Sequence, residues 1–229
     1  ASGYANSVCG RFAFYSPAEA TASLFGAHGS IDVTPRYNIA PTQFIAGVRN
    51  DEEGDRELVT FRWGLVPFWA KDPSIGNRMI NARAETIAEK PSFRAAYRKR
   101  RCLILADGFY EWHTEDGVKL PYYISLASGE PFAFAGLWEH WDSKETDESL
   151  QTATIVTTAA NEFVANLHHR MPVVLEPATA DRWMNGDTTL LEDVTGNAPA
   201  LRAWPVARTV NNARNESPDL IDPDGDPVS

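Results

Sequence analysis

Cys9 opens the run Cys9-Gly10-Arg11-Phe12 near the start of the chain, and its chemistry depends on what precedes it. When a cysteine is the first residue of a protein, its α-amine and its thiol lie on adjacent carbons. The amine can condense with an aldehyde to an imine, and the thiol can then close a five-membered thiazolidine. Eight residues precede Cys9 in this sequence, so its nitrogen is an amide as long as they are attached. The chemistry therefore requires a chain that begins at Cys9.

Cysteine also has a plain structural use, because most cysteines of intracellular proteins are small buried hydrophobes. The second cysteine, Cys102, lies in an apolar run over residues 101–106 that is typical of a buried strand. Two cysteines in 229 residues supply neither a disulfide framework nor the ligand spacing of a zinc site. We find no secretory segment and no apolar run of membrane-spanning length, and we expect a soluble, cytoplasmic protein that does not bind membranes.

Five further segments place polar side chains where a hydrophobic core does not need them. They cover residues 37–43, 63–70, 81–86, 107–112 and 167–172. The carboxylate of Glu111 lies between aromatic residues, and burial there would make it a stronger base. His168 and His169 precede a proline-bounded strand, and an imidazole of near-neutral pKa can donate or accept a proton. The composition of these segments indicates acid–base chemistry.

Structural roles remain open for the same residues. Glu111 could be a strand carboxylate paired with an arginine, and Trp69 could be one of several tryptophans that fill the core. His168 and His169 could bind a metal, but no Asp, Glu or His has the spacing of a further ligand. We expect no metal and no cofactor.

The net charge of −10 argues against indiscriminate nucleic-acid binding. The charge is uneven, because residues 78–101 contain eight basic side chains and only two acidic ones. A local charge of +6 in an acidic protein favours a phosphate-binding surface over a solvated helix face. The acidic segment over residues 211–229 is interrupted by prolines, and we expect it to be poorly ordered and dispensable for binding.

The elements that must position these residues are mainly strands. Strands are predicted over residues 43–48, 57–63, 101–106, 109–113, 121–126, 132–137, 152–157 and 201–207, and helices over 16–25, 91–100, 160–167 and 177–185. Ser16-Pro17-Ala18-Glu19 has the form of a capping box at the first helix. Strands that come in runs, rather than alternating with helices, indicate an α+β fold with antiparallel sheets.

Cys9-Gly10-Arg11-Phe12 and the five segments resemble, in their order, the SRAP family, whose members shield abasic sites in single-stranded DNA. The similarity extends from Cys9 to about Ala207, and six dispersed motifs are far more specific than any one of them. It implies one domain over residues 9–210, built on barrel-like antiparallel sheets with a few short helices. It also implies a monomer that crosslinks abasic sites in single-stranded DNA, with associated autopeptidase and lyase-like activity.

The resemblance further implies a role for each matching residue. Cys9 matches the nucleophile, Asn81 the residue that orients the reacting sugar, and Glu111 the active-site glutamate. His168, rather than His169, matches the catalytic histidine. The residues similar to DNA contacts of the family are Asn38, Pro41, Trp69, Arg83, Thr157 and Arg170.

Residues 1–8 depart from the family pattern, because a thiazolidine needs a free amine at Cys9. The annotated start could be too early, with Val8 encoded by an alternative start codon, and we favour this origin. The leader could also be removed by attack of Cys9 on the Val8 carbonyl, or be a cloning remnant. Two other functions stay open: a cysteine peptidase or amidohydrolase that uses Cys9 and His168, and a non-enzymatic module that binds single strands.

Overall fold

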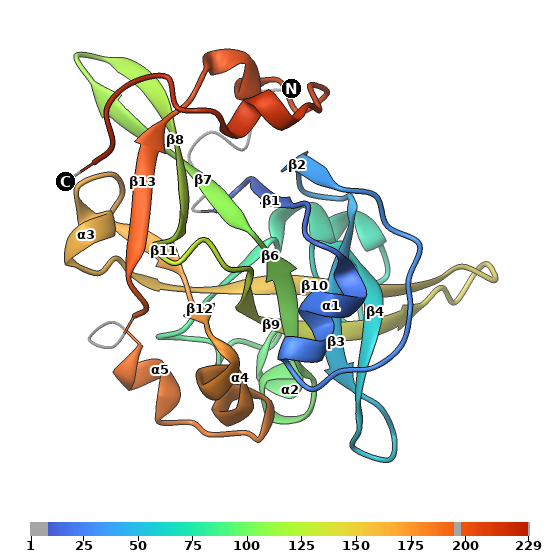
Figure 1. Cartoon of the computed structure of the whole chain (residues 1–229). Coiled ribbons are helices and arrows are strands. Elements are labelled where there is room, and N and C mark those ends of the chain that lie inside the picture. Colours follow the sequence, from blue (N-terminus) through green and yellow to red (C-terminus); the bar gives the residue numbers. More distant parts are fainter. Residues whose placement is uncertain (1–8, 195–197, 229) are drawn as a thin grey trace.

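The larger of the two sheets has eight strands, and five of them form a closed ring (Figure 1). In this computed structural model, which describes residues 9–194 and 198–228, the ring consists, in pairing order, of β10 (Ser149–Ala159), β4 (Arg56–Trp63), β3 (Phe44–Asn50), β6 (Arg101–Ala106) and β9 (Phe132–Asp142). β9 also pairs with β10, which closes the barrel. Within this ring of five strands the pairing of β10 with β4 is parallel and the others are antiparallel. Gly47 allows the close approach of β3 to β6, because a Cβ there would lie 2.6 Å from the carbonyl oxygen of Leu103.

The second sheet has five antiparallel strands. Their order is β13 (Leu201–Pro205), β8 (Val118–Leu126), β7 (Gly108–Glu115), β1 (Phe12–Phe14) and β2 (Arg36–Ile39). The chain passes from the barrel into this sheet at Asp107, between β6 and β7. The Asp107 carboxylate accepts hydrogen bonds from the backbone N–H groups of Tyr15 and Ser16, at 2.7 and 2.9 Å. This carboxylate therefore fixes the end of β1 to the point where the two sheets meet.

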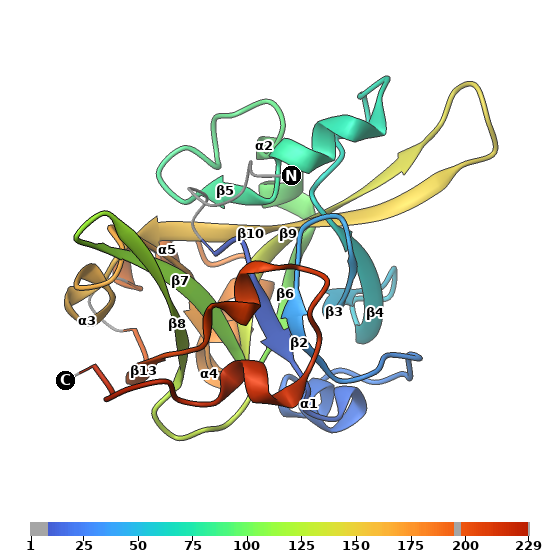
Figure 2. The same cartoon turned by 90° about the horizontal axis from the view of Figure 1, so that it is seen from above.

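Three short strands extend the barrel where β10 ends. β5 (Asn81–Arg83) pairs in parallel with β10, β11 (Arg170–Pro172) pairs with it in antiparallel fashion, and β12 (Val174–Leu175) pairs with β9. Figure 2 shows β5 alongside β10. The C-terminal half of β10 thus pairs with both β5 and β11, which are separated by about ninety residues in the sequence.

The helices are short. They are α1 (Ala18–Leu24), α2 (Arg94–Lys99), α3 (Glu162–Ala165), α4 (Pro177–Met184), α5 (Leu190–Asp193) and the 3-10 turns η1 (Pro73–Arg78), η2 (Arg208–Asn211) and η3 (Pro218–Ile221). The predicted capping box at α1 is wrong, because no side chain caps this helix. The Ser16 hydroxyl instead donates to Asp107 at 2.5 Å.

The C-terminal segment is packed against the second sheet, which corrects the expectation of a poorly ordered tail. Val210 and Leu220 are 0% and 3% exposed. They lie in a cluster of buried side chains with Tyr110 and Tyr123. In Figure 2 this red segment crosses beside β1 and β2. The aromatic side chains of the sheet supply the apolar surface on which this segment packs, and the composition of the segment alone does not reveal that surface.

The predicted α+β fold with largely antiparallel, barrel-like sheets and few helices is confirmed, as is its organisation as a single domain. The predicted strands are present, several of them longer than expected, while β1, β2, β5 and β11 were missed because runs of three or four residues carry no clear periodicity. Among the described residues, no helix has the length and apolar character needed to cross a membrane.

Candidate active site around Cys9

Cys9 lies just before β1, and its nitrogen points at a carboxylate. The pairing of Phe12 with Phe109 sets β1 against β7, which brings Glu111 beside Cys9. The N–H of Cys9 donates to Oε1 of Glu111 over 2.7 Å in a buried environment. The backbone φ of Cys9 is 44°, in the left-handed region that non-glycine residues seldom adopt. The backbone is thus held in an unfavourable turn at the residue whose nitrogen meets the carboxylate.

Burial sets the protonation of both groups. It raises the pKa of Glu111 from 4.5 to about 8, although the hydrogen bond from Cys9 acts in the opposite direction. Burial, and then the charge of Glu111, raise the pKa of the Cys9 thiol well above its ordinary value. At neutral pH the sulfur therefore carries its proton, while Glu111 can both accept and release one. Any step that needs a thiolate must transfer that proton as the sulfur reacts, and Glu111 is the nearby base.

His168 lies in the turn between α3 and β11. Its Nδ1 is 3.1 Å from the backbone nitrogen and 3.2 Å from the carbonyl oxygen of Arg170, so Nε2 is the ring nitrogen left for a substrate. Burial lowers the pKa of His168, and the ring is neutral at pH 7. Nδ1 of His113, on the same strand as Glu111, lies 3.4 Å from the Leu167 carbonyl oxygen. This contact joins the strand of Glu111 to the turn of His168.

Asn81 and Arg83 stand on β5. Asn81 is in register with Ile155 of β10, and Arg83 with Thr157. The indole of Trp63 connects this strand to the Cys9 region, because its Nε1 donates to the Ile80 carbonyl at 3.0 Å and its ring packs on Phe12 at 5.2 Å between centroids. Arg83 is exposed, as a phosphate contact requires.

Arg170 is bonded within the protein. Its guanidinium donates to both carboxylate oxygens of Glu85 and, at 2.9 Å, to the Thr157 carbonyl. Thr157 itself is only 2% exposed. Arg170 and Thr157 thus hold β5, β10 and β11 together, and Glu85, for which the sequence predicted no role, supplies the counter-charge.

Of the other predicted DNA contacts, only Trp69 is exposed, at 46%, and it follows the exposed Phe68. Pro41 is buried. The Asn38 side chain is fully buried, and its amide binds main-chain carbonyls of residues 210–215 instead of facing solvent. The sequence signal for this partner segment is a small number of apolar residues, among them Val210 and Leu220, within the polar tail.

The basic side chains of residues 78–101 include some that are exposed and some that bind other groups of the protein. Arg94, Arg98 and Lys99 are exposed on α2. Arg100 pairs with buried Glu139 at 2.7 Å. The guanidinium of Arg101 lies 4.4 and 4.5 Å from the ring centroids of Tyr97 and Trp183. Arg98 and Lys99 also border a cavity of about 440 Å³ that Phe68 lines. Among the described residues, no group of three His, Cys, Asp or Glu side chains is placed to hold a metal.

The sequence and the fold are similar to those of known proteins. The family model described as SOS response associated peptidase (SRAP) matches residues 8–213, which include every candidate residue named above. The chain belongs to the SRAP family. It is 42% identical over 226 residues to the abasic site processing protein YoqW of Bacillus subtilis, covering 94% of this chain and 99% of that one.

More distant SRAP relatives are matched over similar lengths. The abasic site processing protein YedK of Escherichia coli is 32% identical, with 94% of this chain and all of that protein covered. A solved structure of a protein from Bacteroides thetaiotaomicron is 25% identical and superimposes with a TM-score of 0.82, covering 94% of this chain and 99% of that one. The predicted family and fold are therefore confirmed.

Proposed function

We propose that this protein processes abasic sites in single-stranded DNA by capturing them covalently through Cys9. The observation that carries the proposal is the nitrogen of Cys9, aimed at Oε1 of Glu111 over 2.7 Å. Membership of the SRAP family and the names of its relatives, which are abasic site processing proteins, support the same substrate.

The proposed reaction begins at the nitrogen. The open-chain sugar of an abasic site presents an aldehyde, and the free amine of Cys9 attacks its carbon to give a carbinolamine. Loss of one water yields an imine, and the sulfur then attacks the same carbon while the thiol proton ends on the nitrogen. One C–N and one C–S bond form, and one water leaves. Glu111, with a pKa of about 8, accepts and returns the protons.

His168 has the complementary task of opening the sugar. The cyclic form of an abasic site hides its aldehyde as a hemiacetal, and opening it moves the proton of the anomeric hydroxyl to the ring oxygen as the ring C–O bond breaks and the C=O bond forms. The Nε2 side of His168 is left for this transfer, because Nδ1 is engaged by the Arg170 backbone. We assign Asn81 to orienting the opened sugar, from its place on β5 beside β10.

Exposed side chains give the strand its binding surface. We assign Arg83 to a phosphate and Trp69 to stacking on a base, because both side chains are exposed and single-strand binding relies on these two kinds of contact. The bonded and buried residues Asn38, Pro41, Thr157 and Arg170 would shape this surface through the backbone segments that they hold.

The working form is proposed to begin at Cys9. The left-handed φ of 44° exists only while a residue precedes Cys9, so removing the leader relieves a conformational cost of about 1 kcal/mol. This supports removal of the leader from a chain that is made with it. Intact-mass analysis of protein from its native host tests the proposal, and protein that retains residues 1–8 and still crosslinks would refute it.

The function is tested with three single-stranded oligonucleotides that are identical except for one position. One contains an abasic site, one contains an abasic site reduced to the alcohol, and one is undamaged. We expect protein starting at Cys9 to form an adduct with the first alone, at the summed mass minus one water. A peptidase or a simple binding module predicts no adduct with any of the three.

A further inference from the structure

The side chain of Asn38 joins the C-terminal segment to Arg11, the residue before β1. Its Nδ2 donates to the carbonyl oxygens of Val210, Asn212 and Asn215, at 3.3, 3.1 and 2.9 Å. Its Oδ1 accepts a hydrogen bond of 2.7 Å from Nη1 of Arg11. Since Asn38 is fully buried, loss of its amide would leave several buried polar groups without partners, which makes this contact strong.

The same segment reaches the residues next to both reacting groups. Nη1 of Arg11, two residues after Cys9, donates to the Val210 carbonyl at 2.9 Å. Nε1 of Trp112, the residue after Glu111, donates to Oδ1 of Asn211 at 2.7 Å. The neighbours of the nucleophile and of its base are therefore held by two consecutive residues of η2.

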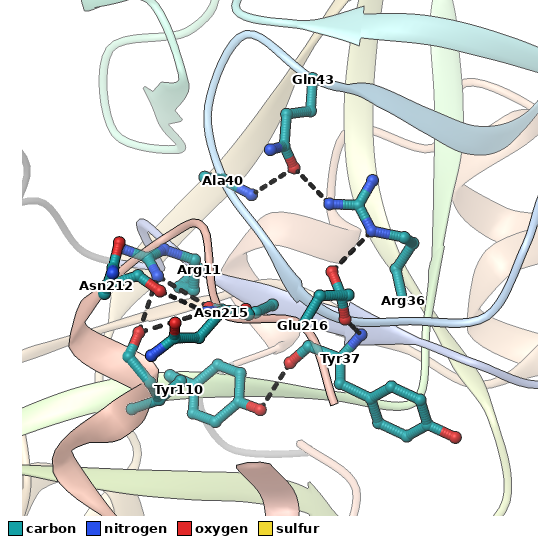
Figure 3. A network of polar contacts seen from close by, with 11 residues as sticks. Arg11, Arg36, Tyr37, Ala40, Gln43, Tyr110, Asn212, Asn215 and Glu216 are labelled. Carbon is teal, nitrogen blue, oxygen red and sulfur yellow. Dashed lines mark hydrogen bonds and ion pairs between the residues drawn. The ribbon is translucent and has the colours of Figure 1, made fainter. Parts of the chain in front are cut away.

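A second anchor keeps this segment in place. Nε of Arg36 pairs with Glu216 at 2.6 Å, and the backbone N–H of Tyr37 donates to the same carboxylate. The hydroxyl of Tyr110, which precedes Glu111, donates to the Tyr37 carbonyl at 2.6 Å. Figure 3 shows the contacts of Arg36 with Glu216, of Glu216 with Tyr37 and of Tyr37 with Tyr110.

A chain that begins at Cys9 needs such support. The first residues of a domain are poorly ordered unless they are tied down. β1 has only three residues, and its pairing with β2 is irregular between Phe12 and Phe14. The reaction nevertheless requires the free amine to stay within hydrogen-bonding distance of Glu111, and a misplacement of about 1 Å can cost about 10²-fold in rate.

We infer that residues 208–216 form a positioning element for the reaction at Cys9, with Asn38, Arg11 and Trp112 as its attachment points. The element holds the amine of Cys9 and the carboxylate of Glu111 at their mutual distance without touching the DNA. The inference rests on the proposed function, since it concerns the rate of adduct formation.

Two substitutions and one control test the inference. Asn211→Ala removes the acceptor of the Trp112 bond at an exposed residue, where the fold tolerates the change. Asn38→Ala removes the central contact. Asn212→Ala is the matched control, because it is the adjacent exposed asparagine and its side chain bonds only the backbone N–H of Arg214.

The readouts are the rate of adduct formation at saturating abasic DNA as a function of pH, and the Kd for undamaged single-stranded DNA. We expect Asn211→Ala to slow the adduct about threefold with Kd unchanged, and Asn38→Ala to slow it at least about tenfold. Both should shift the pH–rate profile, because Glu111 loses its contact with Cys9, whereas Asn212→Ala should match the wild type.

Unchanged rates and pH profiles in folded Asn211→Ala protein would overturn the inference, even if Asn38→Ala does not fold. A chain truncated after Ala207 that folds and forms the adduct faster would also overturn it, because the segment would then be an inhibitory cover. Failure of the proposed function looks different, since the wild type would then form no adduct at all.

Discussion

The two cysteines have nearly the same thiol environment and very different backbones. Cys9 and Cys102 are both fully buried, and burial raises the pKa of both thiols well above the ordinary value. Cys102 lies within β6, paired with Arg49 and Gly136, and its carbonyl accepts a 3.0 Å bond from the Trp183 indole. Cys9 lies at a strand end in a left-handed conformation, with its nitrogen on a carboxylate.

This difference supports the proposal that the reaction begins at the nitrogen. A cysteine that reacts first as a thiolate is usually partly exposed and close to positive charge. Cys9 has neither property, because its burial is complete and its charged neighbour is Glu111. Cys9 differs from Cys102 because its backbone nitrogen, which becomes an amine when the chain starts at Cys9, has a side-chain carboxylate as its partner. Sulfur is then the second nucleophile, and it acts after the imine has formed.

Exchanging each cysteine for alanine gives the largest expected effect. Cys9→Ala should abolish the stable adduct, because only a 1,2-aminothiol can close the thiazolidine, while binding of undamaged single strands persists. Cys102→Ala should keep the adduct and lower Tm by several degrees, since it leaves a small cavity in the barrel. Intact mass and a thermal melt measure both.

Cys9→Ser in a chain with a free amine refines the same comparison. It should give at most a weak, reversible product, because oxygen replaces the sulfur that closes the ring. Full-strength stable crosslinking by Cys9→Ala would disprove the mechanism, and loss of crosslinking in folded Cys102→Ala would remove the distinction between the two cysteines.

The next largest expected effect comes from Glu111 and His168, the residues proposed to transfer protons, which belong to the Cys9 region and not to that of Cys102. Glu111→Gln retains an acceptor for the Cys9 nitrogen but cannot take up a proton, and we expect it to slow adduct formation by about 10²-fold or more. His168→Ala should have an effect of similar size, and DNA binding should survive both changes. His169→Ala is the control and should matter much less, although its ring stacks on His168 at 4.4 Å. An essential His169 beside a dispensable His168 would reverse this assignment.

The sequence motifs identified the candidate site residues better than the long-range contacts that position them. Cys9, Glu111 and His168 stand in local patterns, with polar groups among aromatic residues or beside prolines, and such patterns are visible in a short window of sequence. The contact of Cys9 with Glu111 spans 102 positions and arises from the register of β1 on β7, which no local pattern specifies.

Burial was the property least accessible from the sequence. Asn38 and Arg170 resemble DNA contacts of the SRAP family, but their side chains bind carbonyls and a carboxylate of the protein. The residues that satisfy them, at 210–215 and at Glu85, lie far away in the chain. The tail was misjudged for a similar reason, because its acidic composition outweighs the few apolar side chains that order it.

A smaller effect separates DNA binding from chemistry. Arg83→Ala should weaken binding of single strands and reduce the salt slope by about 0.7, the value for one neutralised phosphate. Arg98→Ala tests whether the exposed cations of α2 also contact the strand. Arg101→Ala should leave the slope unchanged, since its guanidinium is bonded to carbonyls and rings. A slope unaffected by Arg83→Ala would place the DNA on another face.

The last prediction distinguishes the two cysteine regions by stability alone, in protein that retains its leader. The pKa of Glu111 is raised from 4.5 to about 8, so the folded protein binds this proton more tightly than the unfolded chain does. The resulting stabilisation is complete below pH 4.5 and is lost as the pH rises through about 8. Glu111→Gln carries no such proton, and its Tm should fall less between pH 6 and pH 9, by about 5 °C or more. Cys102→Ala should follow the wild-type pH dependence at a lower Tm. Parallel curves for wild type and Glu111→Gln would mean that the carboxylate beside Cys9 is ionised at neutral pH like an ordinary glutamate, and they would contradict the raised pKa.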